Sequence, residues 1–153
     1  MTSLIGKIFV LLILLTLAFL AWRHEEEPGD AIAPRQETDQ ALSCPGVALA
    51  DRQSAMRLHK TSVHGDGEVV KVLPDDEKGA RHQRFLLRVA PHLVVLVAHN
   101  IDLAPRIDGL AAGDRLSFCG EYIWNDKGGV LHWTHGASGK VGGWLRAGER
   151  VYR

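Results

Sequence analysis

The chain has little of the chemistry that marks common enzymes or nucleic-acid binders. Its 153 residues include only two cysteines and 7% aromatic residues, and the formal net charge is zero. A neutral chain argues against nucleic-acid binding through bulk positive charge, although a local basic groove stays compatible with neutrality. The sequence contains no phosphate loop, dinucleotide fingerprint, Cys-x-x-Cys pair or serine-nucleophile elbow. What is left is an ordinary composition for one globular domain with a real core.

The scarcity of cysteine leaves one open question about covalent structure. Cys44 and Cys119 are the only thiols. A disulfide between them is permitted outside the cytoplasm, and the alternative is two separate thiols. Sequence alone does not decide between these, because it does not place the two Cα atoms.

The one long apolar run lies at the N-terminus. Ile8 to Ala21 is uninterrupted and follows Lys7, while the flank after it, "RHEEE", is acidic. This asymmetry predicts that the N-terminus lies in the cytoplasm and the body of the protein outside. No good small-residue cleavage site follows the run directly, so residues 1–22 are interpreted as an uncleaved signal anchor. The alternative is a cleaved signal peptide and a secreted protein.

The next segments predict a linker and then a mostly β domain. Residues 23–40 are polar with two prolines and are interpreted as a flexible linker before a domain at 41–153. A short helix is expected over 45–56, where Ala and Leu predominate. Strands are predicted at 67–73, 82–89, 92–100, 114–123 and 129–135, with a hairpin over 143–153 that turns at Ala147-Gly148. This pattern favours a small OB-like β-barrel, closed or partly open, with one or two short helices.

Three long motifs carry a family resemblance: "VLPDDEKGARHQRFLLRV", "LVAHNIDLAPRIDGLAAGDRLSFCGEY" and "GGVLHWTH…GGWL". Over residues 66–153 the chain resembles the bacterial family catalogued as domain of unknown function 3465. The resemblance implies a small OB-like protein with an N-terminal export or anchor segment, and it implies no established activity. With the anchor, this places the protein in the bacterial inner membrane as a single-pass protein whose domain lies in the periplasm or outside the cell.

A metal-assisted hydrolase is the first functional hypothesis. His99, His132 and His135 could ligate a divalent transition metal whose bound water attacks a phosphodiester or nucleic-acid substrate. In this hypothesis Glu121 acts as the general base and Arg84 clamps the anion. The spacing is unfavourable on a straight strand, because His132 and His135 then point to opposite faces. At most one of them would join His99 and Glu121, unless the strand bulges near Thr134.

The alternative hypothesis is a non-catalytic OB-type module in the cell envelope. It would bind single-stranded nucleic acid, an oligosaccharide or a protein partner, with Tyr122, Trp124 and Trp133 as stacking surfaces for bases or sugars. The remaining candidate binding residues are His82, Asn100, Asp102, Arg106 and Asn125. A third interpretation is structural, because such residues also hold irregular loops together through side-chain hydrogen bonds.

Overall fold

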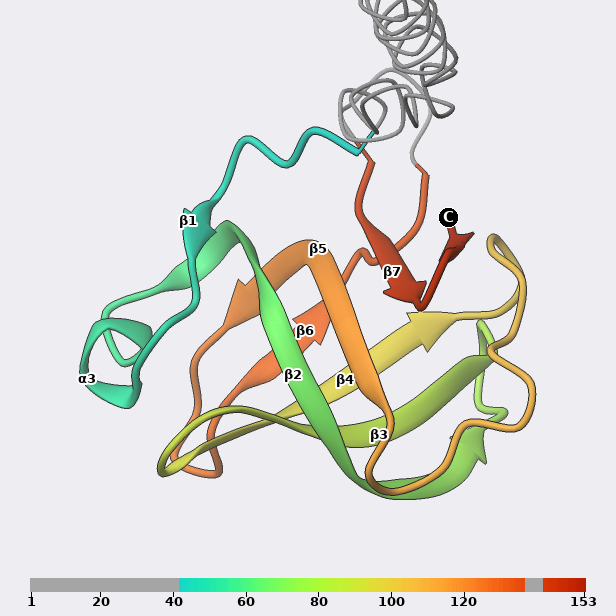
Figure 1. The fold of residues 1–153 in the computed structure, drawn as a ribbon, viewed down its shortest axis with the longest axis horizontal. Coiled ribbons are helices and arrows are strands. Elements are labelled where there is room, and N and C mark those ends of the chain that lie inside the picture. The colour runs from blue at the N-terminus through green and yellow to red at the C-terminus, as the bar shows by residue number, and fades with distance from the viewer. Residues whose placement is uncertain (1–41, 137–141) are drawn as a thin grey trace, which may run out of the picture. The chain divides into compact units, whose positions relative to one another are not determined.

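The computed structural model describes residues 42–136 and 142–153. Within these ranges the chain is mainly β, with one four-residue helix (Figure 1). The elements are β1 (Val47–Ala48), α3 (Arg52–Ala55), β2 (His59–Asp76), β3 (His82–Ala90), β4 (Leu93–Asn100), β5 (Arg115–Ile123), β6 (Val130–His132), β7 (Trp144–Ala147) and β8 (Arg150–Tyr152). The predicted anchor over 1–22 and linker over 23–40 lie outside the described residues. In the described part of the chain, no helix has the length and apolarity needed to span a membrane.

The strands form one sheet that curls into a partial ring. Their order is β1-β2-β3-β4-β6-β5-β7-β8, and β2 pairs additionally with β5. The pairings therefore return to β2 after passing through β3, β4, β6 and β5. Most neighbours are antiparallel, whereas β4 with β6 and β1 with β2 are parallel. In Figure 1, β2 and β5 pass in front of β3, β4 and β6.

The 18-residue strand β2 makes this curvature possible because it pairs with two other strands of the ring, β3 and β5, in addition to β1. Its first half pairs with β5 from His59 to Glu68, and its second half pairs with β3 from Glu68 to Asp76. Gly67 lies just before this change of partner. A Cβ built there would lie 2.6 Å from Leu87 Cγ, so only glycine lets the two strands approach this closely.

The core lies inside the curled sheet and is built by alternation along the strands. Phe85 and Leu87 on β3 are fully buried, and Val95 and Val97 on β4 are buried opposite them. The inward face of β5 follows the same alternation. Its buried residues are Leu116, Phe118 and Tyr122, which pack with Leu131 and Leu145.

Cys44 and Cys119 form a disulfide, with Cα atoms 5.9 Å apart. This answers the question that the sequence left open. Cys119 alternates outward on β5, and Cys44 lies just before β1. The bond therefore ties the start of the described chain to the outer face of the sheet.

Two predicted elements were wrong in extent. The helix expected over 45–56 is confined to Arg52–Ala55, where the Asp51 side chain caps it by accepting from the Ser54 backbone N–H at 2.9 Å. The segment before it forms β1 instead, because the disulfide holds Cys44 beside β2 and Gly46 packs directly against the backbone of Ser62.

The strand predicted over 129–135 ends at His132. Trp133 adopts a φ of 53°, in the left-handed region that interrupts a strand. Thr134 and His135 after it are both buried, so they do not alternate as residues of a strand would. The other predicted strands lie within two residues of the observed ones, except that β2 extends beyond 67–73 at both ends. The terminal hairpin turns at Gly148, which has a φ of 57°.

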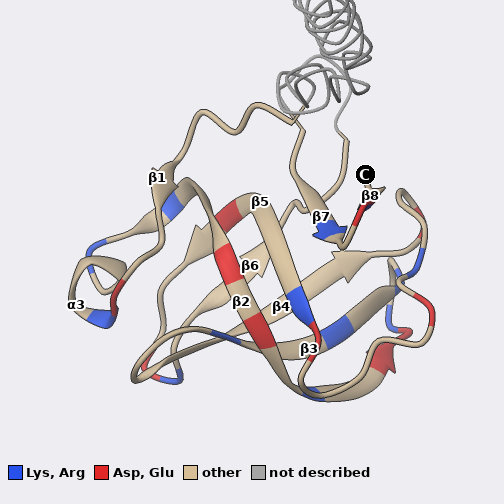
Figure 2. Ribbon diagram, viewed as in Figure 1, with Lys and Arg blue, Asp and Glu red and all other residues tan. Residues whose placement is uncertain are grey.

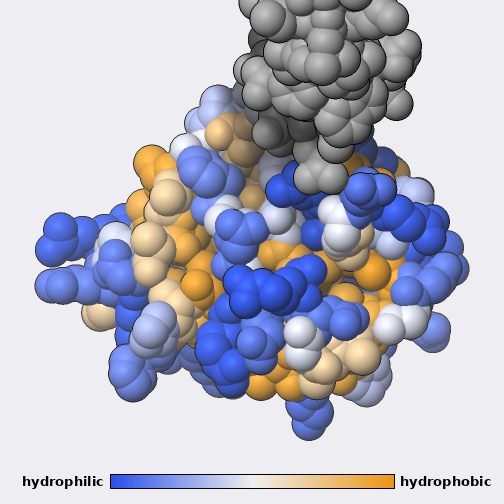
Figure 3. Space-filling view, in the orientation of Figure 1, coloured by the Kyte–Doolittle hydropathy of each residue, from blue (hydrophilic) through white to orange (hydrophobic). Residues whose placement is uncertain are grey.

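The surface carries both charge signs without a single-sign field. Figure 2 shows basic and acidic residues interspersed over the strands. The face seen in Figure 3 is largely hydrophilic over β2 and β5, with apolar side chains between the charged ones. This distribution agrees with the net charge of zero, and the described residues form no extended basic track in this view.

Candidate functional site

His99, predicted as a metal ligand, is a fully buried side chain that already has two partners. Its Nε2 donates to the Pro105 carbonyl oxygen at 3.1 Å, and its Nδ1 lies 2.8 Å from Thr134 Oγ1. A carbonyl oxygen only accepts, so Nε2 carries the proton, and neutral Nδ1 then accepts from the threonine hydroxyl. Burial lowers the pKa of His99, which favours this neutral form. His99 thus joins the loop after β4 to the segment after β6.

The loop after β4 is fastened by further predicted site residues. The Asn100 side chain accepts from the Asp102 backbone N–H at 2.9 Å. Asp102 in turn accepts from both the backbone N–H and the Nε of Arg81, each at 2.7 Å. Buried Gln83 exchanges two hydrogen bonds with the Ile107 backbone, each 2.9 Å long. These contacts are those of the structural interpretation, in which polar side chains hold an irregular loop.

Arg84 and Arg106 act at the end of β2. Arg106 forms an ion pair with Asp75. Arg84 donates to the Pro74 carbonyl oxygen at 3.0 Å and lies 4.0 Å from Asp76. Both guanidinium groups therefore have partners within the chain, and neither is an unengaged anion clamp.

Trp124 and Asn125 shape the turn between β5 and β6. The Asn125 side chain accepts from the backbone N–H groups of Lys127 at 2.9 Å and Gly129 at 3.1 Å. The Arg52 guanidinium lies 4.8 Å from the centre of the Trp124 ring, which also packs against the core. Tyr122, considered for stacking, is fully buried, and its hydroxyl donates to the Gly128 carbonyl at 2.8 Å.

Glu121 and His132 are brought together on neighbouring strands. They are direct partners in the β5–β6 register, and His132 Nε2 lies 3.1 Å from Glu121 Oε1. The buried Nε2 nevertheless has no hydrogen bond of normal geometry, so this is a close but poorly aligned contact. Burial lowers the pKa of His132, and the neighbouring carboxylate opposes that effect without cancelling it. His132 is thus the member of the His-x-x-His pair that joins Glu121.

The four histidines of the predicted motifs form an electrostatic group, which we call the histidine cluster: His82, His99, His132 and His135. His82 and His135 each lower the pKa of both His99 and His132, which places all four within electrostatic reach. His135 is 4% exposed, and its Nδ1 donates to the Gly136 carbonyl at 2.8 Å.

Trp133 lies between the last two histidines of the cluster in the sequence. Its ring centre is 5.3 Å from that of His135 and 6.3 Å from that of His132. Half of its surface is exposed, which makes it the most accessible of the three aromatic residues predicted as stacking surfaces.

The cluster does not fit the predicted three-histidine metal site. Both nitrogens of His99 are engaged, so that side chain has no lone pair for a metal ion. Over residues 42–136 and 142–153, no group of three or more His, Cys, Asp or Glu side chains is arranged to hold a metal ion. Glu121 and His132 are the predicted pair that the fold does bring together.

An aliphatic row crosses the outer face of the sheet beside the Glu121–His132 pair. The register places Leu86 beside Leu96, Leu96 beside Val130, and Val130 beside Ile123. Each of these four alternates with residues buried in the core, and each is half-buried. The sequence did not predict this row, because it depends on the pairing of β4 with β6, which are not consecutive strands.

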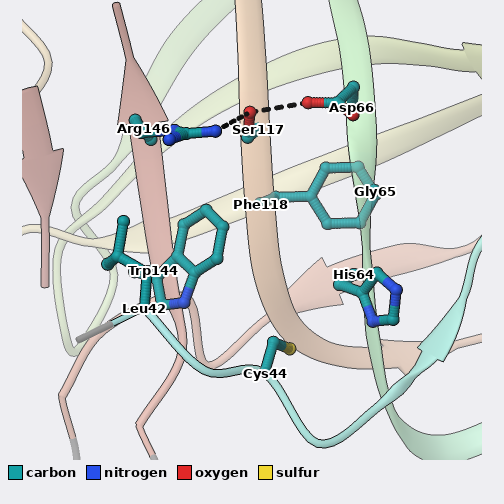
Figure 4. A pocket seen from close by; sticks show the side chains of 9 residues that line it. All are labelled: Leu42, Cys44, His64, Gly65, Asp66, Ser117, Phe118, Trp144 and Arg146. Atoms are coloured by element: carbon teal, nitrogen blue, oxygen red, sulfur yellow. Dashed lines mark hydrogen bonds between the residues drawn. The ribbon is translucent and has the colours of Figure 1, made fainter. Parts of the chain in front are cut away.

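Sequence reasoning also missed a hollow of about 250 Å³ beside the disulfide, which we call the disulfide hollow (Figure 4). The Ser117 hydroxyl donates to Asp66 Oδ1 at 2.6 Å and accepts from Arg146 Nη2 at 3.3 Å. The hollow is lined by Leu42, Cys44, His64, Gly65, Asp66, Ser117, Phe118, Trp144 and Arg146. Alternation along 114–123 could have placed Ser117 and Cys119 on one outer face, but no sequence signal placed β2 and β7 on either side of them.

Two of the residues that line this hollow each carry a buried polar atom without a hydrogen-bond partner. They are His64 Nδ1 and the indole Nε1 of Trp144, whose side chain is 8% exposed overall. A buried donor without an acceptor costs about 1–3 kcal/mol relative to one that is hydrogen-bonded. Most buried polar groups avoid this cost, so these two atoms differ from the well-paired loop contacts of His99, whereas His132 Nε2 in the histidine cluster lacks a partner in the same way.

Fold and contacts together define the class: a small, mainly β protein on a partial ring of strands, with polar side chains that tie its loops to the ring. Residues 34–153 match the family described as protein of unknown function (DUF3465), and the chain belongs to this family. The resemblance predicted from its motifs is thereby confirmed. No curated protein and no solved structure matches the chain.

Proposed function

We propose that the protein is a non-catalytic, OB-like binding module whose ligand is a protein partner. The aliphatic row carries this proposal. Four aliphatic side chains in register on the outer face of a sheet form a continuous apolar strip, which is the kind of surface that protein partners cover. The flanking Arg84, His132 and Glu121 would supply the polar rim of such an interface.

The strand pairings support the OB-like part of the proposal. Five strands form the ring in the spatial order β2, β3, β4, β6, β5, and β5 pairs back with β2. Within the ring only β4 and β6 are parallel. OB-type barrels are five-stranded, partly open Greek-key rings that bind ligands on the face of their second and third strands. Here those strands are β3 and β4, which contribute Leu86 and Leu96 to the row.

The aromatic residues favour a protein over a nucleic acid or a glycan. Stacking on exposed rings supplies much of the affinity for single strands and sugars. Tyr122 is in the core, Trp124 is covered by Arg52, and only Trp133 among the three candidates is half-exposed. Among the described residues, the interleaved charges of Figure 2 form no basic track for phosphates in that view either.

The metal-assisted hydrolase has less support in the geometry. It needs His99 as a ligand, and the bonds to Pro105 and Thr134 use both of its ring nitrogens. Glu121 contacts His132 rather than standing free beside a substrate position. A measurement separates the two functions: stoichiometric transition metal in the purified protein, lost in His132→Ala, would favour the hydrolase.

We further propose that the module works in the periplasm, anchored by the N-terminal segment. The disulfide supports an oxidising compartment. The apolar run from Ile8 to Ala21 has a length between that of a signal-peptide core and a short membrane span, and Leu4 and Ile5 can extend it. Labelling of single cysteines by a membrane-impermeant maleimide in intact cells tests this. Reagent should reach a cysteine placed at exposed Lys78 in cells with a permeabilised outer membrane, and no labelling before lysis would contradict it.

Photocrosslinking in the native cells tests the binding face. A photoreactive benzoylphenylalanine placed at Leu96 or Ile123 should yield a discrete protein adduct. The matched control is the same residue at Val151, which is also half-buried but lies on β8. Adding Leu86→Lys should abolish the adduct from position 96, because it places a charge in the row.

Two outcomes contradict the proposed function. One is equal crosslinking from position 151, which would mean that the row has no special affinity. The other is a nuclease-sensitive adduct from the row, which would assign the face to nucleic acid instead of protein.

A further inference from the structure

Trp133 is held in a strained backbone conformation although half of its surface is in solvent. Its φ of 53° lies in the left-handed region, which a bulky residue enters only at an energetic cost. The residue is 50% exposed, so burial of the ring in the core does not offset that cost. Strained residues of this kind cluster at sites that contact a ligand or a partner.

Glu121 carries a negative charge that no neighbouring cation compensates. Among the described residues its only ion-pair contact is the 3.1 Å approach to His132, and burial favours the neutral form of that histidine. The Glu121 side chain is 34% exposed, and neither of its carboxylate oxygens is a buried atom without a hydrogen-bond partner. The carboxylate is therefore accessible to a positively charged group from outside the chain.

His132 places the ring and the carboxylate next to the aliphatic row. Its Nε2 is the atom close to Glu121, and its ring centre lies 6.3 Å from that of Trp133. In the β5–β6 register His132 is opposite Glu121, and Val130 is opposite Ile123 of the row. The exposed ring, the carboxylate and the row are thus neighbouring parts of one outer surface.

We propose that this surface receives an arginine side chain of the protein partner, which stacks on Trp133 and pairs with Glu121. The inference rests on the proposed function, because the partner is the protein that covers the aliphatic row. A guanidinium group suits both contacts, since it is planar, stacks on aromatic rings and forms paired hydrogen bonds with a carboxylate. The chain already contains one such stack, in which the Arg52 guanidinium lies 4.8 Å from the centre of the Trp124 ring.

Nuclear magnetic resonance of the full chain in a neutral detergent tests the site with a defined probe, N-acetylarginine methylamide. The indole N–H signal of Trp133, assigned by its loss in Trp133→Phe, should shift in a saturable way. The citrulline analogue has a neutral urea group of the same shape and should shift the signal much less. The Trp124 signal is an internal control and should stay in place, because Arg52 already covers that ring.

Two glutamate variants give the titration a second readout. Glu121→Gln should weaken binding of the arginine probe about threefold to fivefold, as expected for loss of a partly exposed ion pair. Glu68→Gln is the matched control. Glu68 lies on β2 and pairs with Arg88 at 3.3 Å, so its loss should leave binding of the probe unchanged.

Crosslinking in the native cells connects the site to the partner. Trp133→Gly should reduce the adduct from a photoreactive residue at Leu96 severalfold. Glycine adopts a φ of 53° without strain, so this variant should stay folded, which urea unfolding checks. An unchanged adduct in folded Trp133→Gly would overturn the inference and leave the proposed function standing. No adduct from Leu96 or Ile123 in the otherwise unaltered chain would instead contradict the proposed function itself.

Three results of the titration would also overturn the inference. The first is a Trp133 signal that does not move at tens of millimolar arginine probe. The second is an equal response to the citrulline analogue, which would reduce the contact to stacking without charge recognition. The third is unchanged binding of the arginine probe in a folded Glu121→Gln protein.

Discussion

The histidine cluster and the disulfide hollow are two polar regions of one small sheet, and they differ in how their polar atoms are satisfied. Around His99 of the cluster, the side chains of His99, Asn100 and Asp102 all have partners within the same chain. Beside the hollow, Trp144 Nε1 and His64 Nδ1 have none, and in the cluster His132 Nε2 has none either. The loop contacts of His99, which belong to a conspicuous sequence motif, are therefore better satisfied than the atoms beside the hollow. A segment rich in polar residues can hold loops together through side-chain hydrogen bonds as readily as it can form a functional site.

The largest expected effect on stability comes from loss of the disulfide beside the hollow. Cys44→Ser removes a crosslink that spans 75 residues of sequence, and the chain-entropy relation gives a loss of about 4 kcal/mol in the free energy of unfolding. Urea denaturation of the wild type with and without reductant should reproduce the loss. The Cys44→Ser, Cys119→Ser double variant is the control, because reductant should not affect it. Identical midpoints in all these samples would show that the bond constrains nothing.

The next effect is on the cluster, where His99 is predicted to be structural. His99→Leu fills the space but leaves the Thr134 hydroxyl and the Pro105 carbonyl without their partner, at a cost of about 2–3 kcal/mol. Thr134→Val removes one of the two bonds and should cost less. Thermal or urea unfolding measures both. A stability loss under about 0.5 kcal/mol for His99→Leu would mean that the loop does not depend on this histidine.

A third effect is the pH dependence of the stability of the folded protein. The folded state lowers the pKa of His99 and His132 below the ordinary value of 6.5. Below pH 6.5 the unfolded chain therefore takes up protons that the folded protein still excludes, and the stability present above that pH is lost as the pH falls toward the folded pKa values. Unfolding measured between pH 7.5 and 5 should show this decline. A His99→Gln, His132→Gln protein should show a flatter profile, and an unchanged slope would refute the assignment.

The smallest expected loss of stability comes from removing the partly exposed Glu121–His132 contact, which is weaker than the buried hydrogen bonds of His99. Both side chains are about one-third exposed, so Glu121→Gln should cost less than about 1 kcal/mol. It should also lower the pKa of His132 further, because the carboxylate is the group that raises it. Titration of the His132 ring signal by nuclear magnetic resonance checks the direction. A rise in that pKa would contradict the contact described here.

The sequence predicted the local parts of both regions and missed the parts that depend on strand pairing. Alternation is a property of each strand alone, and it groups Leu116, Phe118 and Tyr122 on one face of β5, which the structure buries. The prediction of Tyr122 as a stacking surface was therefore wrong. The end of β6 at His132 was missed, because nothing in the composition of "HWTH" indicates that Trp133 adopts a left-handed backbone conformation.

The disulfide hollow could not be predicted at all. It needs β2 and β7 on either side of β5, and these pairings join residues far apart in the chain. The aliphatic row has the same origin in the β4–β6–β5 order. Pairing of distant strands is decided by the whole core and not by a local motif, which is why neither surface had a recognisable signature in the sequence.

The pairing of β2 with both β3 and β5 has a consequence for folding during synthesis. Its second half pairs with β3, the next strand in the chain, while its first half must wait for β5, which follows much later. During synthesis the β2–β3–β4 meander can form early, whereas the side of β2 that pairs with β5 remains an unpaired edge until β5 emerges. That interval is when the nascent chain is most exposed to pairing with the wrong strand, and the Cys44–Cys119 bond can only seal the correct arrangement afterwards.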